Sequence, residues 1–177
     1  MRLFVALDLP WELKRRLELL CGGIPGVCVV PAENFHLTLR FIGEVSAVQA
    51  EDIDHALAAI RAPGFGISLA GVGTFTKAGR ATALWVGVDR NAALNHLQAK
   101  IENALRRTGL DPARRRFTPH VTLARLDNVP EVKVAAFVQD RNLFRAAPAQ
   151  MDYFTLLSSV LGRDGSVYTP EVTYALD

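Results

Sequence analysis

The chain has 177 residues, of which 50% are hydrophobic and 21% charged, and its formal net charge is only +2. This composition is that of a soluble globular protein and excludes an intrinsically disordered one. No apolar run approaches the ~18 residues that a membrane-spanning helix needs, and Asp8 interrupts the short apolar N-terminus. We therefore expect no signal peptide, no membrane contact, a cytoplasmic location and a single domain spanning residues 1–177.

Hydrophobic periodicity and turn residues predict helices and strands that alternate along the chain. Ser46 and Gln49 have the spacing of a capping box, Asn91 suits a second N-cap, and Gly22-Gly23 suits a helix end. The segment 73–81, GTFTKAGRA, is expected to form the loop of a hairpin. In chain order, the predicted elements are a strand at 2–7, a helix at 10–21, a strand at 35–42, a helix at 46–60, strands at 67–72 and 81–88, a helix at 91–109, a strand at 117–124, a helix at 131–139, and strands at 153–160 and 172–176 with a hairpin turn at 163–165.

The order of the predicted elements is similar in the two halves of the chain, and no linker or low-complexity tract separates them. Strands that alternate with helices but are joined by hairpins favour antiparallel pairing with helices on one face. We therefore predict an α+β fold built as a bilobal duplication: two small, mainly antiparallel sheets that face a central groove, with helices on the outside.

One short motif, histidine-aliphatic-threonine-leucine, occurs once in each half. It lies in NFHLTLRF at 34–41 and in FTPHVTLAR at 117–125, so His36 and His120 are 120 − 36 = 84 positions apart. Because residues two apart in a strand share a face, each histidine shares one with the threonine two positions later, Thr38 or Thr122. The opposite faces are apolar, with Phe35, Leu37, Leu39 and Phe41 in the first strand and Phe117, Val121 and Leu123 in the second. A single copy is most simply the polar face of a half-buried strand, but two copies on matching strands predict that both faces meet in one groove.

Two imidazoles and two hydroxyls suit phosphoryl transfer without a metal. The pKa of imidazole is near 6.5 in the absence of perturbation, so one histidine can accept a proton while the other donates one. Threonine hydroxyls can stabilise the non-bridging phosphate oxygens. A zinc site would lack a third ligand, and Cys21 and Cys28 are interpreted as reduced structural residues. The chain also contains neither a serine-hydrolase nucleophile elbow nor a Walker loop, and no cofactor is expected.

These motifs and their neighbours resemble a known family. The duplicated H-x-T resembles the two-histidine (2H) phosphoesterase superfamily. The segments RLFVAL, NFHLTLRFIGEV, GTFTKAGRATALWVGV, RRRFTPHVTLAR and LSSVLGRDGSVYTP, taken in order, resemble the LigT-like RNA 2′,3′-cyclic phosphodiesterases, also called 2′-5′ RNA ligases. The resemblance covers nearly the whole chain. It implies a metal-independent enzyme that opens a 2′,3′-cyclic phosphate at an RNA end to a 2′-phosphomonoester and that can join tRNA halves through a 2′-5′ linkage in the reverse direction.

The resemblance also implies roles for individual residues. His120 corresponds to the base that activates water and His36 to the acid that protonates the 3′-oxygen, while Thr38 and Thr122 bind the phosphate. Arg125, five positions after His120, corresponds to the family's phosphate-side arginine.

Three arginines are candidates for binding the substrate. Strict alternation places Arg125 on the apolar face of its strand, so it reaches the groove only if the strand ends, bulges or twists after Leu123. Alternation places Arg116 and Arg40 on the catalytic face, and both are therefore further candidates for substrate binding. Arg116 also closes the arginine run 114–116, which favours an anionic ligand.

Two alternatives to the RNA phosphodiesterase remain open. The same site could act on a small cyclic nucleotide or an ADP-ribose cyclic phosphate, or the protein could bind RNA ends without catalysis. Two intact H-x-T motifs argue against the second alternative, because binding alone would tolerate the loss of either histidine. We expect a monomer whose partner is RNA with a 2′,3′-cyclic phosphate end.

Overall fold

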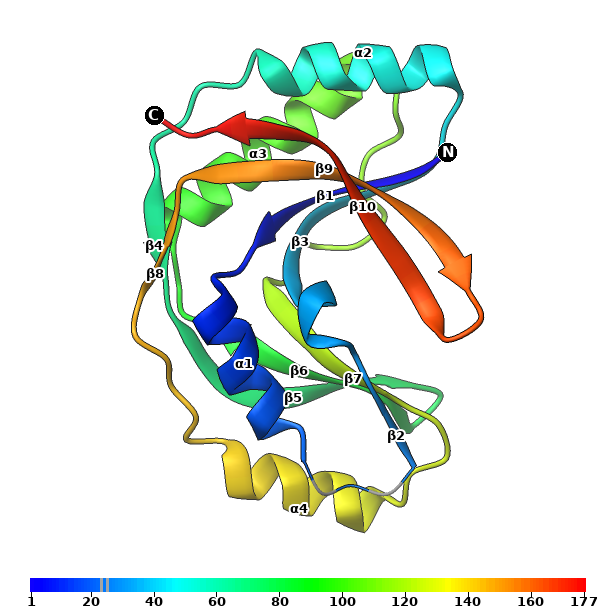
Figure 1. Cartoon of the computed structure of the whole chain (residues 1–177), viewed down its shortest axis with the longest axis vertical. Helices are drawn as coiled ribbons and strands as arrows, with labels where there is room; N and C mark the ends of the chain where they lie inside the picture. The colour runs from blue at the N-terminus through cyan, green and yellow to red at the C-terminus, as the bar shows by residue number, and fades with distance from the viewer. Residues whose placement is uncertain (23, 25) are drawn as a thin grey trace.

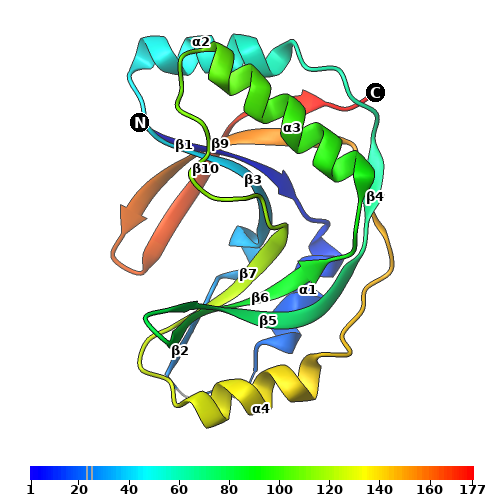
Figure 2. The same ribbon diagram turned by 180° about the vertical axis from the view of Figure 1, so that it is seen from behind.

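The computed structural model describes residues 1–22, 24 and 26–177, which form the α+β fold shown in Figures 1 and 2. Its elements in chain order are β1 (Arg2–Asp8), α1 (Trp11–Leu20), β2 (Val27–Val29), the 3₁₀ turn η1 (Ala32–Asn34), β3 (His36–Glu44), α2 (Ala47–Ala58), β4 (Phe65–Ile67), β5 (Leu69–Lys77), β6 (Arg80–Val88), α3 (Ala92–Arg107), β7 (His120–Leu126), α4 (Glu131–Arg141), β8 (Ala149–Met151), β9 (Tyr153–Gly162) and β10 (Gly165–Ala175). No helix of the described residues is long and apolar enough to cross a membrane.

The strands form two groups with helices on their outer sides. The main strand order is β10-β9-β1-β3-β7-β6-β5, with β2 added to β7, and β4 and β8 pair separately. Helices α2 and α3 cover the β1–β3–β9–β10 group, and α4 lies against the β5–β6 side (Figures 1 and 2). The predicted α+β class, antiparallel pairing and outer helices are therefore confirmed.

The two groups meet between β3 and β7. Among the described residues, these strands share one antiparallel pair, Leu37 with Val121, and both side chains are fully buried in the core. His36 and His120 each immediately precede a member of this pair. Because the strands run in opposite directions, His36 lies toward Thr122 and His120 toward Thr38. The junction of the halves thus sets the two motifs in a head-to-tail arrangement.

The local signals for helix starts are confirmed. Ser46 and Gln49 form both hydrogen bonds of the capping box, and the Asn91 side chain accepts a hydrogen bond from the Leu94 amide. Helix α1 ends at Leu20; of the predicted Gly22-Gly23 stop, Gly23 lies outside the described residues.

The predicted hairpin between the strands is present, but its loop is much shorter than the predicted segment 73–81. Strands β5 and β6 continue through this segment and are joined at Ala78-Gly79, where both residues have positive φ, 51° and 76°. Positive φ at both central positions matches the right-handed twist of a hairpin, so a two-residue turn suffices. Strand β10 likewise begins at Gly165, the last residue of the predicted turn, and is much longer than expected.

Candidate active site

Both histidines stand at the first position of a strand and are held in the same way. Nδ1 of His36 lies 2.7 Å from the carbonyl oxygen of Asn34, and Nδ1 of His120 lies 2.6 Å from that of Thr118. A carbonyl oxygen only accepts hydrogen bonds, so in each neutral imidazole Nδ1 carries the hydrogen and Nε2 is free to exchange a proton. Nε2 of His36 also lies 2.9 Å from the Thr38 hydroxyl, which can donate to it.

The surroundings of both imidazoles favour the neutral form. Burial lowers the pKa of His36 and that of His120 below the ordinary 6.5, and the hydrogen bonds to the Asn34 and Thr118 carbonyls oppose this lowering. Protonated His120 also lowers the pKa of His36, so the two imidazoles are close enough to sense each other's charge. We therefore expect them to titrate as a coupled pair.

Aromatic rings account for the burial of each imidazole. The ring centroid of His36 lies 5.1 Å from that of Phe4 and 5.3 Å from that of Tyr168. On the other side of the junction, the centroid of His120 lies 4.7 Å from that of Phe75 and 6.5 Å from that of Trp85. The duplication therefore extends to an aromatic pair beside each histidine.

The sequence analysis missed these aromatic residues. Phe75 and Trp85 belong to the segment misread as a loop and its following strand. Gly73 is part of the same arrangement, because a Cβ there would lie 2.4 Å from the Trp85 ring. Extending β5 and β6 to the short turn would have brought Phe75 and Trp85 beside the second motif.

Arg125 lies on the face of β7 that carries His120 and Thr122. Its cross-strand partner is Ala83, and that of Thr122 is Trp85, two positions along β6. The register shifts between Leu84 and Trp85 of β6, which leaves Leu123 of β7 without a cross-strand partner. As a result, Leu123 and Ala124 are both buried and Arg125 is exposed. Strand β7 therefore has the bulge that Arg125 needs in order to share a face with His120.

Arg40 is bonded within the protein. Its Nε lies 2.6 Å from Oε2 of Glu102 on α3, and its Nη2 donates to the carbonyl of Asp111 at 2.6 Å. Glu102 also accepts a hydrogen bond from the Ala113 amide at 2.9 Å. Arg40 and Glu102 thus stabilise the loop between α3 and β7. The guanidinium of Arg40 already forms these interactions within the protein, before any substrate binds.

The prediction that Phe41 belongs to the core is wrong. Two register shifts between β1 and β3 break the alternation, and the Phe41 side chain is 48% exposed. It lines the groove beside Arg40, and the guanidinium carbon of Arg2 lies 5.1 Å from its ring centroid.

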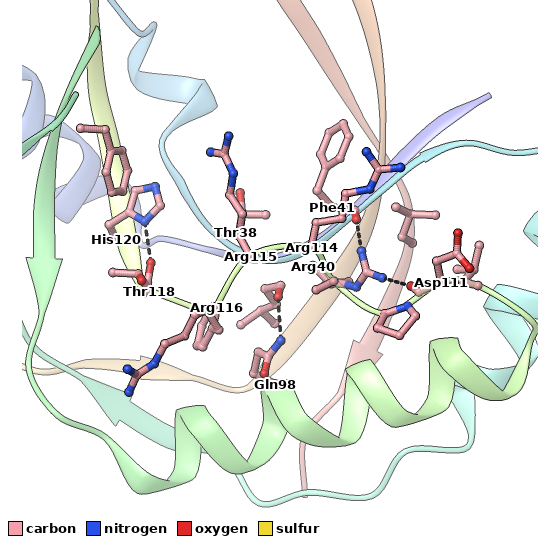
Figure 3. Close-up of a pocket in the computed structure, with 17 residues that line it drawn as sticks. Thr38, Arg40, Phe41, Gln98, Asp111, Arg114, Arg115, Arg116, Thr118 and His120 are labelled. Carbon is pink, nitrogen blue, oxygen red and sulfur yellow. Dashed lines mark hydrogen bonds between the residues drawn. The ribbon is translucent and has the colours of Figure 1, made fainter. Parts of the chain in front are cut away.

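A groove of about 830 Å³ is lined by residues that include His120, Thr38, Phe41 and the arginine run 114–116. In Figure 3, the side chains of Arg114 and Arg115 extend on the same side as those of Phe41 and His120, whereas Arg116 points the other way. Arg116 was predicted to share the catalytic face by strand alternation, but β7 begins at His120, so Arg116 lies outside the strand and alternation does not place it.

The site contains two imidazoles and, on the same strands, the threonine hydroxyls of both motifs. Among residues 1–22, 24 and 26–177, no cluster of three histidine, cysteine or acidic side chains could hold a metal ion. Cys21 and Cys28 are free thiols, and burial raises the pKa of Cys21 to about 11, so this thiol stays protonated at neutral pH.

Comparisons with known proteins agree with this geometry. The family model described as the 2′-5′ RNA ligase superfamily matches residues 29–163. An RNA 2′,3′-cyclic phosphodiesterase of Aeropyrum pernix is 37% identical over 150 residues, covering 82% of this chain and 84% of that protein. One of Escherichia coli is 31% identical over 179 residues, covering 99% and 96%. The crystal structure of E. coli LigT complexed with 3′-AMP superposes with a TM-score of 0.81 at 28% identity, covering 99% of this chain and 97% of that one.

Proposed function

Because the chain belongs to the 2′-5′ RNA ligase superfamily, we propose that it is an RNA 2′,3′-cyclic phosphodiesterase. It hydrolyses a 2′,3′-cyclic phosphate at an RNA end to a 2′-phosphomonoester, without a metal or cofactor. The observation that carries this proposal is the pair of imidazoles, each with Nδ1 held by a carbonyl and Nε2 left for proton exchange, on either side of the Leu37–Val121 junction.

In the proposed reaction, water attacks phosphorus opposite the 3′-oxygen. Nε2 of His120 accepts the proton from water while the P–O3′ bond breaks, and His36 donates a proton to the departing 3′-oxygen. Thr38 and Thr122 hydrogen-bond to the non-bridging oxygens. Burial lowers the pKa of both imidazoles, so the assignment of His120 as the base and His36 as the acid follows from the family resemblance and not from the pKa directions.

The same groove offers contacts for the rest of the RNA. Arg125, on the β7 face that carries His120 and Thr122, would bind the reacting phosphate. Arg114 and Arg115, which line the groove, would bind phosphates of the preceding nucleotides, with Phe41 beside a base. We propose that residues 1–177 act as one monomeric domain in the cytoplasm. The ends of tRNA halves are candidate substrates, and 2′-5′ joining is the same reaction in reverse.

The first prediction is that hydrolysis does not depend on a divalent ion. Protein dialysed against excess EDTA should convert an RNA ending in a 2′,3′-cyclic phosphate to the 2′-phosphate at the same rate as untreated protein. Product identity is read by comparison with authentic 2′- and 3′-phosphate ends. A rate abolished by EDTA and restored by a divalent ion would overturn the proposed chemistry, and binding without turnover would support an RNA-end binder.

The second prediction concerns substrate size. If Arg114 and Arg115 bind flanking phosphates, an oligonucleotide should be preferred to 2′,3′-cyclic AMP. This preference should fall with salt, by a log–log slope of about −0.7 per phosphate contacted on a single strand. Arg114→Met and Arg115→Met should reduce the slope, whereas Arg116→Met, at the residue that points away, should not. Equal rates on both substrates at all salt concentrations would favour the small-molecule alternative.

A further inference from the structure

An ion pair between buried Lys14 and half-exposed Asp8 lies beside His36 and has no part in the reaction described above. Lys14 on α1 is only 7% exposed, and its ammonium nitrogen lies 2.6 Å from Oδ1 of Asp8 at the end of β1. The same ammonium donates to the carbonyl oxygen of Glu33 in η1 at 3.2 Å. A lysine this deeply buried is rare unless it is paired, so its contacts identify what it holds in place.

Each residue that Lys14 contacts is next to His36 or next to a residue that orients it. Asp8 is the cross-strand partner of His36 in the β1–β3 pairing. Glu33 directly precedes Asn34, whose carbonyl oxygen holds Nδ1 of His36. The ammonium therefore links the strand end opposite the imidazole to the turn that orients it.

The charged groups around His36 differ from those around His120. The groups that face His36 are Asp8 from β1, Lys14 from α1, the Tyr168 ring from β10 and His120 across the junction, while the Glu33 side chain of η1 is exposed. For His120, the pKa responds to burial and to the Thr118 carbonyl. The two halves thus supply different charges to otherwise similar imidazoles.

We propose that Asp8 and Lys14 are positioning residues that prepare His36 to act as the proton donor. Asp8 stabilises the imidazolium form, and Lys14 limits this effect while holding Asp8 and the 33–34 turn in place. Burial has the largest effect on the pKa of His36 and lowers it, the Asn34 carbonyl and Asp8 raise it, and Lys14 and His120 lower it. This proposal rests on the assignment of His36 as the acid in the proposed function.

The test compares Asp8→Asn with Lys14→Met by two readouts. Titration of the His36 ring protons by NMR reports the imidazole without requiring activity, and the pH profile of kcat/KM reports its use in the reaction. Asp8→Asn should move the His36 titration to lower pH and Lys14→Met should move it to higher pH, while the His120 titration moves less. Asp8 is half exposed, so we expect Asp8→Asn to lower kcat/KM at pH 7 by at most about fivefold. Lys14→Arg, which keeps the positive charge, should retain the wild-type titration of His36 and the wild-type pH profile of kcat/KM.

Asp52→Asn on α2 and Lys100→Met on α3 are matched controls, because they make the same charge changes at exposed or half-exposed helix positions. Shifts in the same direction for Asp8→Asn and Lys14→Met, or no shift beyond these controls, would show that the pair is only structural. If Lys14→Met does not fold, the comparison of Asp8→Asn with Lys14→Arg still tests the proposal. Opposite NMR shifts in a protein that does not hydrolyse cyclic phosphate ends would support the effect on His36 and overturn the proposed function instead.

Discussion

Replacement of either His36 or His120 by alanine is expected to lower kcat/KM by about 10²–10⁴-fold, the usual contribution of one positioned acid or base. Loss of either group leaves a proton transfer to bulk water, which costs about 3–5 kcal/mol of barrier. The measurement is hydrolysis of an RNA ending in a 2′,3′-cyclic phosphate at pH 7. Thr38→Ala and Thr122→Ala should each have smaller effects, because a hydroxyl contributes one hydrogen bond to the phosphate.

His55 and His96 provide the matched controls. They are exposed residues of α2 and α3, so His55→Ala and His96→Ala should retain wild-type activity.

The wild-type profile of kcat/KM against pH should be bell-shaped and report the coupled pair. Since burial lowers the pKa of both histidines, we expect the acidic limb to lie below pH 6.5. A loss of less than tenfold in either histidine variant would remove that residue from the chemistry.

Replacement of Arg125 by methionine is expected to lower kcat/KM by about 10- to 150-fold, because a hydrogen bond to a charged group contributes about 1.5–3 kcal/mol. The bulge at Leu123 turns this exposed side chain to the face of His120 and Thr122, while its backbone stays in β7. Folding should therefore be unaffected, and the thermal unfolding midpoint serves as the check. Arg116→Met is the matched control and should stay within about twofold of wild type. Equal losses in both variants would mean that Arg125 contributes only to the general positive charge.

Local patterns predicted the α-helices, the longer strands and the two motifs, because these depend on interactions between residues that are close in the sequence. The three-residue strands β2, β4 and β8 were not predicted. The capping box of Ser46 and Gln49 and the burial of Leu37 and Val121 follow from residue spacing alone. The H-x-T duplication similarly identified His36 and His120, whose Nδ1 partners are backbone carbonyls two positions away.

The features that the sequence did not reveal depend on a second strand or helix. The bulge at Leu123 is defined against β6, and the exposure of Phe41 follows from register shifts against β1. A pattern within one strand carries no information about either. Glu102, 62 positions after Arg40, occupies the guanidinium that alternation had assigned to substrate. Such long-range pairs appear only once the chain is folded.

The most direct test of the two-histidine account uses an RNA end whose 3′-bridging oxygen is replaced by sulfur. A thiolate is a much weaker base than an alkoxide, so it departs without needing a proton, whereas the attacking water still needs a base. We expect this substrate to restore His36→Ala to nearly the wild-type rate and to leave His120→Ala impaired. Rescue of His120→Ala instead would reverse the assigned roles, and rescue of neither variant would contradict proton donation to the 3′-oxygen by either histidine.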